Sequence, residues 1–422
     1  MSVKEPMIHL FATTTLLVLA TAALPCTLVA SEQPPNKPLV VPLSKDPSTS
    51  LYTISIKNGA PLVVDLAGSL IWSTCPSTHG TVPCESNTCR VANQQHPRRC
   101  RYVDAGCACT GHPANPITGE CSTGDLTSMA MSANATDGNK ALYPVELSGV
   151  VGSCAPDRLL TSLPAGASGV AGFSQWPLSL PSQLSSQRKF GNAFALCLPH
   201  FATFGNTPIQ LREQNFFPAL TSAIPYIPLV SNPRNGAYYL PVKSISVMWG
   251  GPEVKASLPA GALDLEVNTG RGGVVLSTVT PYMTMRSDVY RAFIQAYDTV
   301  VRGNSYVVER MPPEPPFELC YGSGLRPAKR FGLDVPAISL ELPGAARSWT
   351  VPGANYIVRK SGWAICVGVV EMAPGVEDQP AVVVGTMQLE EHLLVFDLDN
   401  GTMGFSDLLW YLETSCSAFN LQ

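Results

Sequence analysis

Short apolar stretches separated by turn residues recur along the whole chain, and they predict a protein built mainly of β-strands. Residues 51–56 alternate apolar and polar side chains as a half-buried strand does, residues 57–59 form a turn signal, and residues 62–64 return as an apolar strand. This predicted hairpin ends at Asp65, and the apolar residues 70–72 follow after a short turn. The pattern therefore predicts a buried strand that delivers one carboxylate to a turn.

The rest of the chain repeats the strand pattern and adds one clear helical segment. Further strands are predicted at residues 193–198, 238–247, 317–321, 363–366 and 394–398. After Ser287-Asp288, a helix-capping signal, residues 289, 293, 296 and 297 fall on one apolar helix face. The Pro- and Asn-rich stretch 225–237 interrupts the pattern and predicts a boundary between two halves.

Composition agrees with a β-rich protein and limits its functions. The 422 residues include 38 Pro and 34 Gly, which imply many turns, and the chain is long enough for two lobes. Charged residues make up 14% of the chain, and the net charge is −4 without any run of Lys or Arg. We therefore expect neither nucleic-acid binding nor electrostatic attachment to a membrane.

The N-terminus has the pattern of a secretory signal peptide over residues 1–30. An apolar run at 10–24 follows Lys4 and is succeeded by small residues up to Ala30. A membrane anchor is the alternative, but the run is short and interrupted by Thr, and no later apolar stretch is long enough to span a bilayer. The pattern predicts a secreted protein without a membrane segment.

The cysteines indicate disulfides. Of the thirteen, Cys26 would leave with the signal peptide. Twelve remain, and an even count in an exported chain predicts six disulfides whose connectivity the spacing leaves open. They are Cys75, Cys84, Cys89, Cys100, Cys107, Cys109, Cys121, Cys154, Cys197, Cys320, Cys366 and Cys416. A zinc site is the alternative for the seven between residues 75 and 121, but their spacing is not that of a usual zinc knuckle.

Residues 63–72 resemble the active-site turn of a pepsin-like aspartic protease. In that family two apolar residues precede Asp-Thr-Gly-Ser, and an apolar pair and Trp follow. Asp65 stands at the catalytic position, but Leu66, Ala67 and Gly68 replace the Thr, Gly and Ser of the family. The frame of the turn is therefore retained while the groups inside it differ.

The resemblance implies a second turn, because these enzymes use two Asp side chains that share one proton. The best match is residues 272–280, in which Ser277 stands at the Asp position and Val279 at the Gly position. Thr123 stands where the family has the Tyr of the flap over the substrate. A Ser hydroxyl cannot replace the paired carboxylate at ordinary pH. Asp65 and Ser277 are therefore expected to be degenerate positions, with no catalytic residue, cofactor or metal.

The alternative is that Ser277 acts as a nucleophile, but it would need an adjacent base, and no Gly-x-Ser-x-Gly motif surrounds it.

A repeated spacing supports the register of the two turns. An apolar-apolar-Gly element ends at Gly172, 107 positions after Asp65, and another ends at Gly385, 108 positions after Ser277. Such a repeat is typical of a duplicated lobe.

Residues 150–154, 166–173 and 177–184 are similar to plant members of this family, and the resemblance covers residues 47–410. Among plant aspartic-protease-like proteins, the xylanase inhibitors of the TAXI type fit best, since they also have degenerate turns and twelve cysteines. The resemblance implies an all-β, mainly antiparallel, bilobal pepsin-like fold with a few short helices. Its N-terminal lobe would be residues 31–235, with a Cys-rich insertion, and its C-terminal lobe residues 236–422.

The resemblance also implies a function without catalysis. We expect a secreted monomer of the apoplast or cell wall that inhibits microbial glycoside hydrolases, chiefly family 11 xylanases, in plant defence. The implied contacts are a loop after residue 321, with Leu325 and Arg326, and the loop 407–414, with Trp410 and Tyr411. The second loop lacks the His that such inhibitors insert into the enzyme. A seed globulin-like or wall-binding glycoprotein is the alternative, and a residual protease is a third.

Two sequons for N-glycosylation complete the candidate sites. They are Asn134-Ala135-Thr136, expected in a polar loop, and Asn400-Gly401-Thr402, expected in a tight turn.

Overall fold

The hairpin predicted before Asp65 forms as expected. In the computed structural model, β2 (Tyr52–Ile54) and β3 (Leu62–Asp65) pair antiparallel. Both strands are buried over their whole length, including the polar residues Thr53 and Asp65. The structure describes residues 1, 37–58, 60–94, 109–136, 141–206, 224–304, 308–322, 333–344, 348–360, 364–375 and 379–419.

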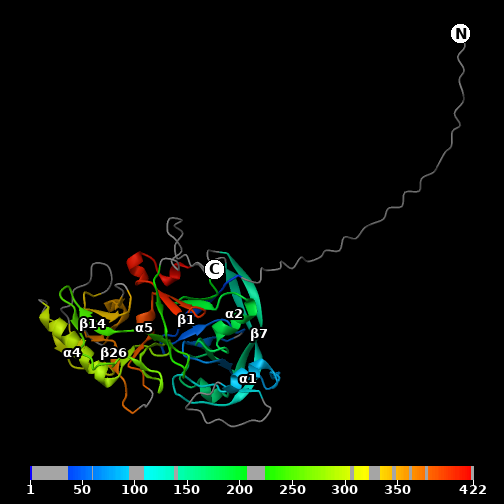
Figure 1. Cartoon of the computed structure of the whole chain (residues 1–422), viewed down its shortest axis with the longest axis horizontal. Helices are drawn as coiled ribbons and strands as arrows, with labels where there is room; N and C mark the ends of the chain where they lie inside the picture. The colour runs from blue at the N-terminus through cyan, green and yellow to red at the C-terminus, as the bar shows by residue number, and fades with distance from the viewer. Residues whose placement is uncertain are drawn as a thin grey trace. The chain divides into compact units, whose positions relative to one another are not determined.

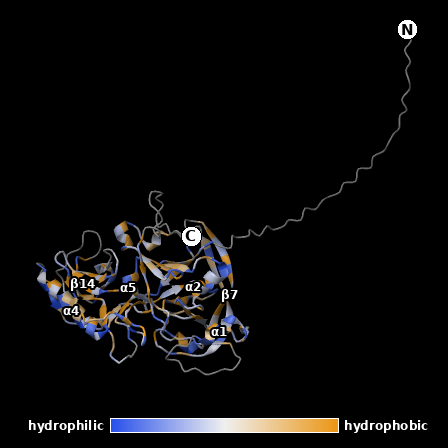
Figure 2. Ribbon diagram, viewed as in Figure 1, coloured by the Kyte–Doolittle hydropathy of each residue, from blue (hydrophilic) through white to orange (hydrophobic). Residues whose placement is uncertain are grey.

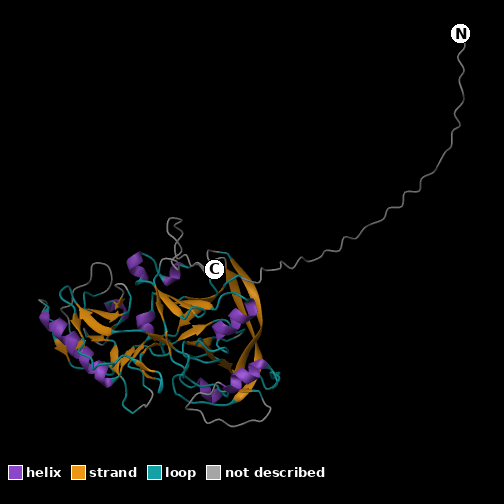
Figure 3. Cartoon of the chain, viewed as in Figure 1, coloured by secondary structure: helices purple, strands orange, loops and turns teal. Residues whose placement is uncertain are grey.

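Figures 1 and 3 show that strands dominate the chain and that the helices are few. In the first half the elements are β1 (Leu39–Lys45), β2, β3, β4 (Ile71–Ser73), α1 (Asn87–Gln94), β5 (Thr110–Gly111), β6 (Gly124–Thr136), β7 (Leu142–Cys154), β8 (Gly169–Gly172), α2 (Leu180–Arg188), β9 (Ala193–Cys197), β10 (Phe201–Phe204), β11 (Tyr226–Pro228) and β12 (Val230–Ser231).

In the second half the elements are β13 (Tyr238–Leu240), β14 (Ser244–Met248), β15 (Val254–Lys255), β16 (Leu265–Glu266), β17 (Arg271–Gly272), β18 (Val274–Leu276), β19 (Met283–Met285), α4 (Ser287–Gly303), β20 (Arg310–Met311), β21 (Cys320–Tyr321), β22 (Ala337–Glu341), β23 (Ser348–Val351), β24 (Ile357–Arg359), β25 (Ile365–Val367), β26 (Val369–Glu371), β27 (Val382–Val384), α5 (Thr386–Leu389), β28 (Leu393–Asp397) and β29 (Thr402–Phe405).

The two halves repeat one strand arrangement. In the first half β3 runs parallel to β8, β8 antiparallel to β4, and β4 parallel to β7. In the second half β18, β27, β19 and β26 follow the same sequence of parallel, antiparallel and parallel pairs. The apolar-apolar-Gly elements of the predicted repeat lie at β8 and at the end of β27, each beside the strand that carries the candidate turn. The fold is therefore bilobal and mostly β, as predicted.

The C-terminal strands return to the sheet of the first half. β28 pairs with β9, β29 pairs with β28, and β11 pairs with β29, so that the largest sheet has 13 strands among the described residues. Residues 225–237 thus contain strands rather than only a linker. The predicted division of the chain at residue 235 stays a proposal.

The helix α4 buries the predicted apolar face, which includes Val289, Phe293 and Tyr297. It begins at Ser287 with Arg286 as the N-cap and without a side-chain cap, so the predicted Ser287-Asp288 cap is wrong. Asp288 instead forms an ion pair with Arg286 at 2.7 Å. Figure 2 shows hydrophilic residues along α4.

No helix in the described part of the chain is both long and apolar enough to span a membrane. The predicted signal peptide, apart from Met1, lies outside the described residues.

Two predicted strands have different bounds in the structure. The strand predicted at 363–366 begins two residues later, as β25, and the strand predicted at 317–321 is shorter, as β21.

Candidate functional site

Asp65 ends a buried strand and lies in a tight turn. Its side chain is only 8% exposed, and its Oδ1 accepts a hydrogen bond from the amide of Ala67 at 2.9 Å. The turn requires glycine at position 68, because a Cβ there would lie 2.7 Å from the Cα of Gly172. Burial raises the pKa of Asp65 to about 6, although the backbone amides of Ala67 and Gly68 oppose the rise.

Ser277 occupies the equivalent place in the second half. Its amide donates to the carbonyl oxygen of Val384 at 2.9 Å, directly after the paired residues of β18 and β27. Its Oγ accepts from the amide of Val279 at 3.2 Å and donates to Thr280 Oγ1 at 3.0 Å. The hydroxyl therefore has the hydrogen-bonding role that Asp65 Oδ1 has in the first turn, without its charge.

Thr278 joins the two turns. Its Oγ1 donates to the carbonyl oxygen of Val64 at 2.7 Å and accepts from the amide of Leu66 at 3.1 Å. Thr278 is fully buried. Leu66, which stands at the matching position of the first turn, has no hydroxyl to return these bonds. Both of these hydrogen bonds between the turns therefore use a side chain of the second turn, and Leu66 of the first turn offers none in return.

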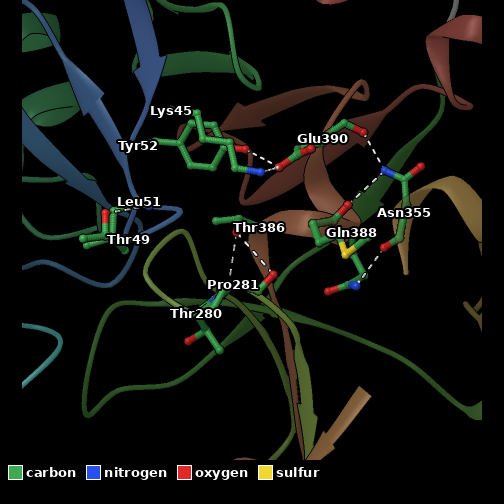
Figure 4. A network of polar contacts seen from close by, with 11 residues as sticks. Lys45, Thr49, Leu51, Tyr52, Thr280, Pro281, Asn355, Thr386, Gln388 and Glu390 are labelled. Carbon is green, nitrogen blue, oxygen red and sulfur yellow. Dashed lines mark hydrogen bonds and ion pairs between the residues drawn. The ribbon is translucent and has the colours of Figure 1, made fainter. Parts of the chain in front are cut away.

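A second polar network connects segments that are far apart in the sequence (Figure 4). Lys45 Nζ and the hydroxyl of Tyr52 both donate to Glu390 Oε1, the lysine at 2.6 Å. The carbonyl oxygen of Glu390 accepts from Asn355 Nδ2 at 2.8 Å. The carbonyl of Asn355 accepts from Gln388 at 2.9 Å. The first hairpin is thereby tied to the segment that follows β27.

A cavity of about 370 Å³ opens beside the first turn. Its described lining includes Asp65, Trp72, His112, Trp176 and Arg234 but not Ser277. Trp72 Nε1 donates to the carbonyl oxygen of Ala114 at 3.0 Å, which fixes its ring. The cavity therefore contacts only one of the two degenerate positions.

Thr123, at the expected flap position, is exposed just before β6. Its Oγ1 lies 3.4 Å from His112 Nδ1. The methyl and hydroxyl groups of Thr do not provide the large ring that would close a flap over a substrate.

The cysteines form disulfides that the spacing could not assign. The structure pairs Cys75 with Cys154, Cys197 with Cys416, and Cys320 with Cys366. Cys84 and Cys121 are also disulfide-bonded. Cys100 and Cys107 lie outside the described residues.

The expectation that all twelve cysteines pair is corrected by two thiols. Cys89, on α1, and Cys109, just before β5, are free and buried, with exposures of 1% and 5%. Burial, followed by a hydrogen bond with Cys89, raises the pKa of Cys109 to about 12. No group of three or more His, Cys, Asp or Glu side chains in the described part of the chain is arranged as a metal site.

The predicted second-lobe contact residues are only partly described. Trp410 and Tyr411 lie on a 3-10 turn, Leu409–Leu412, with exposures of 39% and 49%. The neighbouring Leu412 is 43% exposed, whereas Leu409 is fully buried. Leu325 and Arg326 lie outside the described residues.

The two sequons differ in setting. Asn134 lies half-buried within β6, opposite Pro144, so the expectation of a polar loop is wrong. Asn400 is exposed in the turn between β28 and β29, where its Nδ2 donates to Asp397 Oδ2 at 2.7 Å. Use of either sequon stays a prediction.

Sequence reasoning missed the role of Thr278 and the aromatic lining of the cavity. Thr278 directly follows the degenerate position Ser277, and this place in the motif could have predicted a contact with the other turn. Trp176 gave no such signal, because only the fold brings it beside Asp65.

This geometry defines a pepsin-like fold in which one of the two equivalent turns carries a carboxylate, Asp65, and the other carries Ser277. Comparison with known proteins agrees with this class. A solved structure of an aspartic proteinase from Irpex lacteus superposes with a TM-score of 0.53 at 14% identity over 91% of this chain and all of that one. That likeness concerns the fold alone.

The chain belongs to the family of xylanase-inhibitor-type proteins. The model "Xylanase inhibitor N-terminal" matches residues 52–207, and "Xylanase inhibitor C-terminal" matches residues 237–407. Chitinase CLP of Oryza sativa subsp. japonica is 39% identical over 402 residues, 91% of this chain and 92% of the relative. Gamma conglutin 1 of Prunus dulcis is 31% identical over 407 residues, 92% and 90% of the two chains.

Among solved structures, that of EDGP has a TM-score of 0.82 and 28% identity, covering 92% of this chain and 99% of that one.

Proposed function

We propose that this chain is a secreted, non-catalytic homologue of aspartic proteases that binds and inhibits a microbial glycoside hydrolase, with a family 11 xylanase as the first candidate. Replacement of the second carboxylate by Ser277 argues against proteolysis, because one carboxyl group alone cannot act as both acid and base. The disulfides are typical of exported proteins.

The observation that carries the proposal is the exposed turn Leu409–Leu412. Trp410 and Tyr411 expose large aromatic surfaces of the kind enriched in interface hot spots. Buried Leu409 packs in one apolar cluster with the Cys197–Cys416 disulfide, so the turn has a fixed base. A rigid anchor loses little conformational entropy on binding.

The test is inhibition of a panel of microbial xylanases and chitinases by the mature protein. Inhibition of at least one enzyme, with a complex isolated by size-exclusion chromatography, is the expected result. No inhibition and no complex with any enzyme of the panel would refute the proposal.

A relative of this chain in rice is named chitinase CLP, and this name favours a second candidate function. On this reading the chain is a cell-wall protein that binds chitin itself. Retention of the protein on insoluble chitin in the absence of any enzyme supports this candidate. Release of soluble oligosaccharide during the same incubation would show that the chain is an enzyme and would overturn the non-catalytic proposal.

A further inference from the structure

The carboxyl group of Asp65 lies in the wall of the cavity without a cationic partner. It accepts hydrogen bonds from the backbone amides of Ala67 and Gly68. No cationic side chain of the described residues pairs with it, although its side chain is only 8% exposed. A buried carboxylate without a counter-ion is costly, and a cation that enters the cavity would offset that cost.

Two indole rings share this cavity with the carboxylate. The Trp72 ring is held by its hydrogen bond to Ala114 and is almost fully buried. The Trp176 ring lies on Gly236, where a Cβ would approach Trp176 Cδ1 to 2.4 Å. Trp faces attract organic cations most strongly among the aromatic side chains. Trp72 is too buried to offer its face, but the Trp176 ring is only half-buried, and a carboxylate beside such a ring is an arrangement that favours an ammonium ion.

The other ionisable groups of the described lining do not cancel this preference. Arg234 keeps its positive charge, because its guanidinium group donates to the neutral carbonyl oxygen of Asn268, but the residue is exposed and solvent screens that charge. His112 is buried, with Thr123 Oγ1 near its Nδ1. Asn115 is also in the lining, but its side-chain amide already donates to two backbone carbonyls and accepts from two backbone amides. Asp65 therefore supplies the negative charge of the site.

We infer that the cavity beside Asp65 is a binding site for a small organic ammonium ion, held by the Asp65 carboxylate and the ring of Trp176, while the buried Trp72 forms part of the wall. Its volume of about 370 Å³ falls in the range of small-molecule sites. The amino group of a glucosamine unit, as in deacetylated chitin, is one source of this chemistry, and a lysine side chain is the other. The inference goes beyond the proposed function and does not depend on the Leu409–Leu412 turn.

The experiment is calorimetric titration of the mature protein near neutral pH with three probes. They are a glucosamine hexamer, the N-acetylglucosamine hexamer of equal length without charge, and lysine amide. We expect binding of an ammonium probe, and binding of the acetylated hexamer weaker by about tenfold or more, because charge-assisted hydrogen bonds are lost. Preference for the glucosamine hexamer over lysine amide would identify the sugar as the source, and the reverse would identify lysine.

The variant Asp65→Asn keeps an oxygen for the amide of Ala67 and removes the charge. It should weaken binding of the ammonium probe by about tenfold or more, whereas Asp157→Asn, at an exposed residue that does not line the cavity, should leave binding as in the parent. Melting temperatures of both variants check that they are folded.

Three results overturn the inference. The first is equal binding of the charged and acetylated hexamers. The second is ammonium binding that Asp65→Asn leaves unchanged. The third is binding of the acetylated hexamer alone, insensitive to Asp65→Asn, which would remove this site and leave the chitin-binding candidate in place. Failure of enzyme inhibition has no bearing on this site.

Discussion

Thr278 Oγ1 donates a hydrogen bond to the carbonyl oxygen of Val64 at 2.7 Å, between residues 214 positions apart in the chain. This contact places the strand that carries Asp65 against the turn that carries Ser277. The same hydroxyl accepts from the amide of Leu66 at 3.1 Å. The lobes are therefore still fastened at the site where a protease would have its two carboxylates.

Replacement of Thr278 by Val should destabilise the protein, because Val64 and Leu66 would each keep a buried backbone group without its partner. We expect a loss of about 1–3 kcal/mol in the free energy of unfolding, measured by denaturant titration. Thr299→Val, on the exposed side of α4, is the control and should change stability by less than about 0.5 kcal/mol. Equal stability of both variants would show that the contact contributes nothing.

The mature protein should not cleave denatured globin or casein at any pH from acid to neutral, and pepstatin should have no activity to block. Ser277→Asp alone should leave this unchanged, because Leu66 still lacks the hydroxyl that would complete the paired hydrogen bonds, and Thr123 is too small to close a flap. Pepstatin-sensitive cleavage that disappears in Asp65→Ala would contradict this prediction.

Cys89 and Cys109 should be the thiols that alkylation detects, and only after denaturation. Burial keeps both sulfurs from the reagent, and a pKa of about 12 keeps Cys109 protonated. Mass spectrometry should find two alkyl groups on the denatured, unreduced protein and none on the native one. If none is found after denaturation, the two have joined in a disulfide with each other, as the even cysteine count predicts.

Trp410→Ala should weaken binding to an inhibited enzyme by about thirtyfold, since truncation of an interface anchor costs about 2 kcal/mol or more. The control is Tyr143→Ala, which removes an aromatic side chain that is 38% exposed, close to the 39% of Trp410. Inhibition constants of both variants give the comparison. Loss of inhibition in Asp65→Ala with none in Trp410→Ala would move the contact to the cavity.

Asp65 should make the protein less stable as the pH rises. Its pKa is raised from 3.8 to about 6 in the folded state, so the folded protein binds the proton more tightly than the unfolded chain does. The stability associated with this proton is present below pH 3.8 and is lost as the pH rises through 6. The loss amounts to about 3 kcal/mol.

Asp65→Asn should remove this contribution. Unfolding free energies of the parent and the variant, compared at several pH values, should diverge in favour of the variant as the pH rises from acid to neutral. A constant difference would show that the Asp65 carboxyl has an ordinary pKa.

The sequence by itself determined the β-rich, bilobal plan and the register of the duplicated lobes. Apolar runs divided by turn residues specify where the strands lie, and this pattern is local enough to read from residues 51–65. The replacement of a carboxylate by Ser277 was also visible, because the motif around it is contiguous. The even cysteine count implied disulfides without their pairing.

Only the tertiary structure decided which distant groups meet. Thr278 reaches Val64, and Trp176 reaches the cavity of Asp65, through strand pairings that connect segments far apart in the chain. The pairing of Cys197 with Cys416 spans 219 positions, and the burial of Cys89 and Cys109 as free thiols depends on the packing of α1 against β5. Such contacts depend on where whole strands and helices lie, whereas residue spacing describes only the local chain.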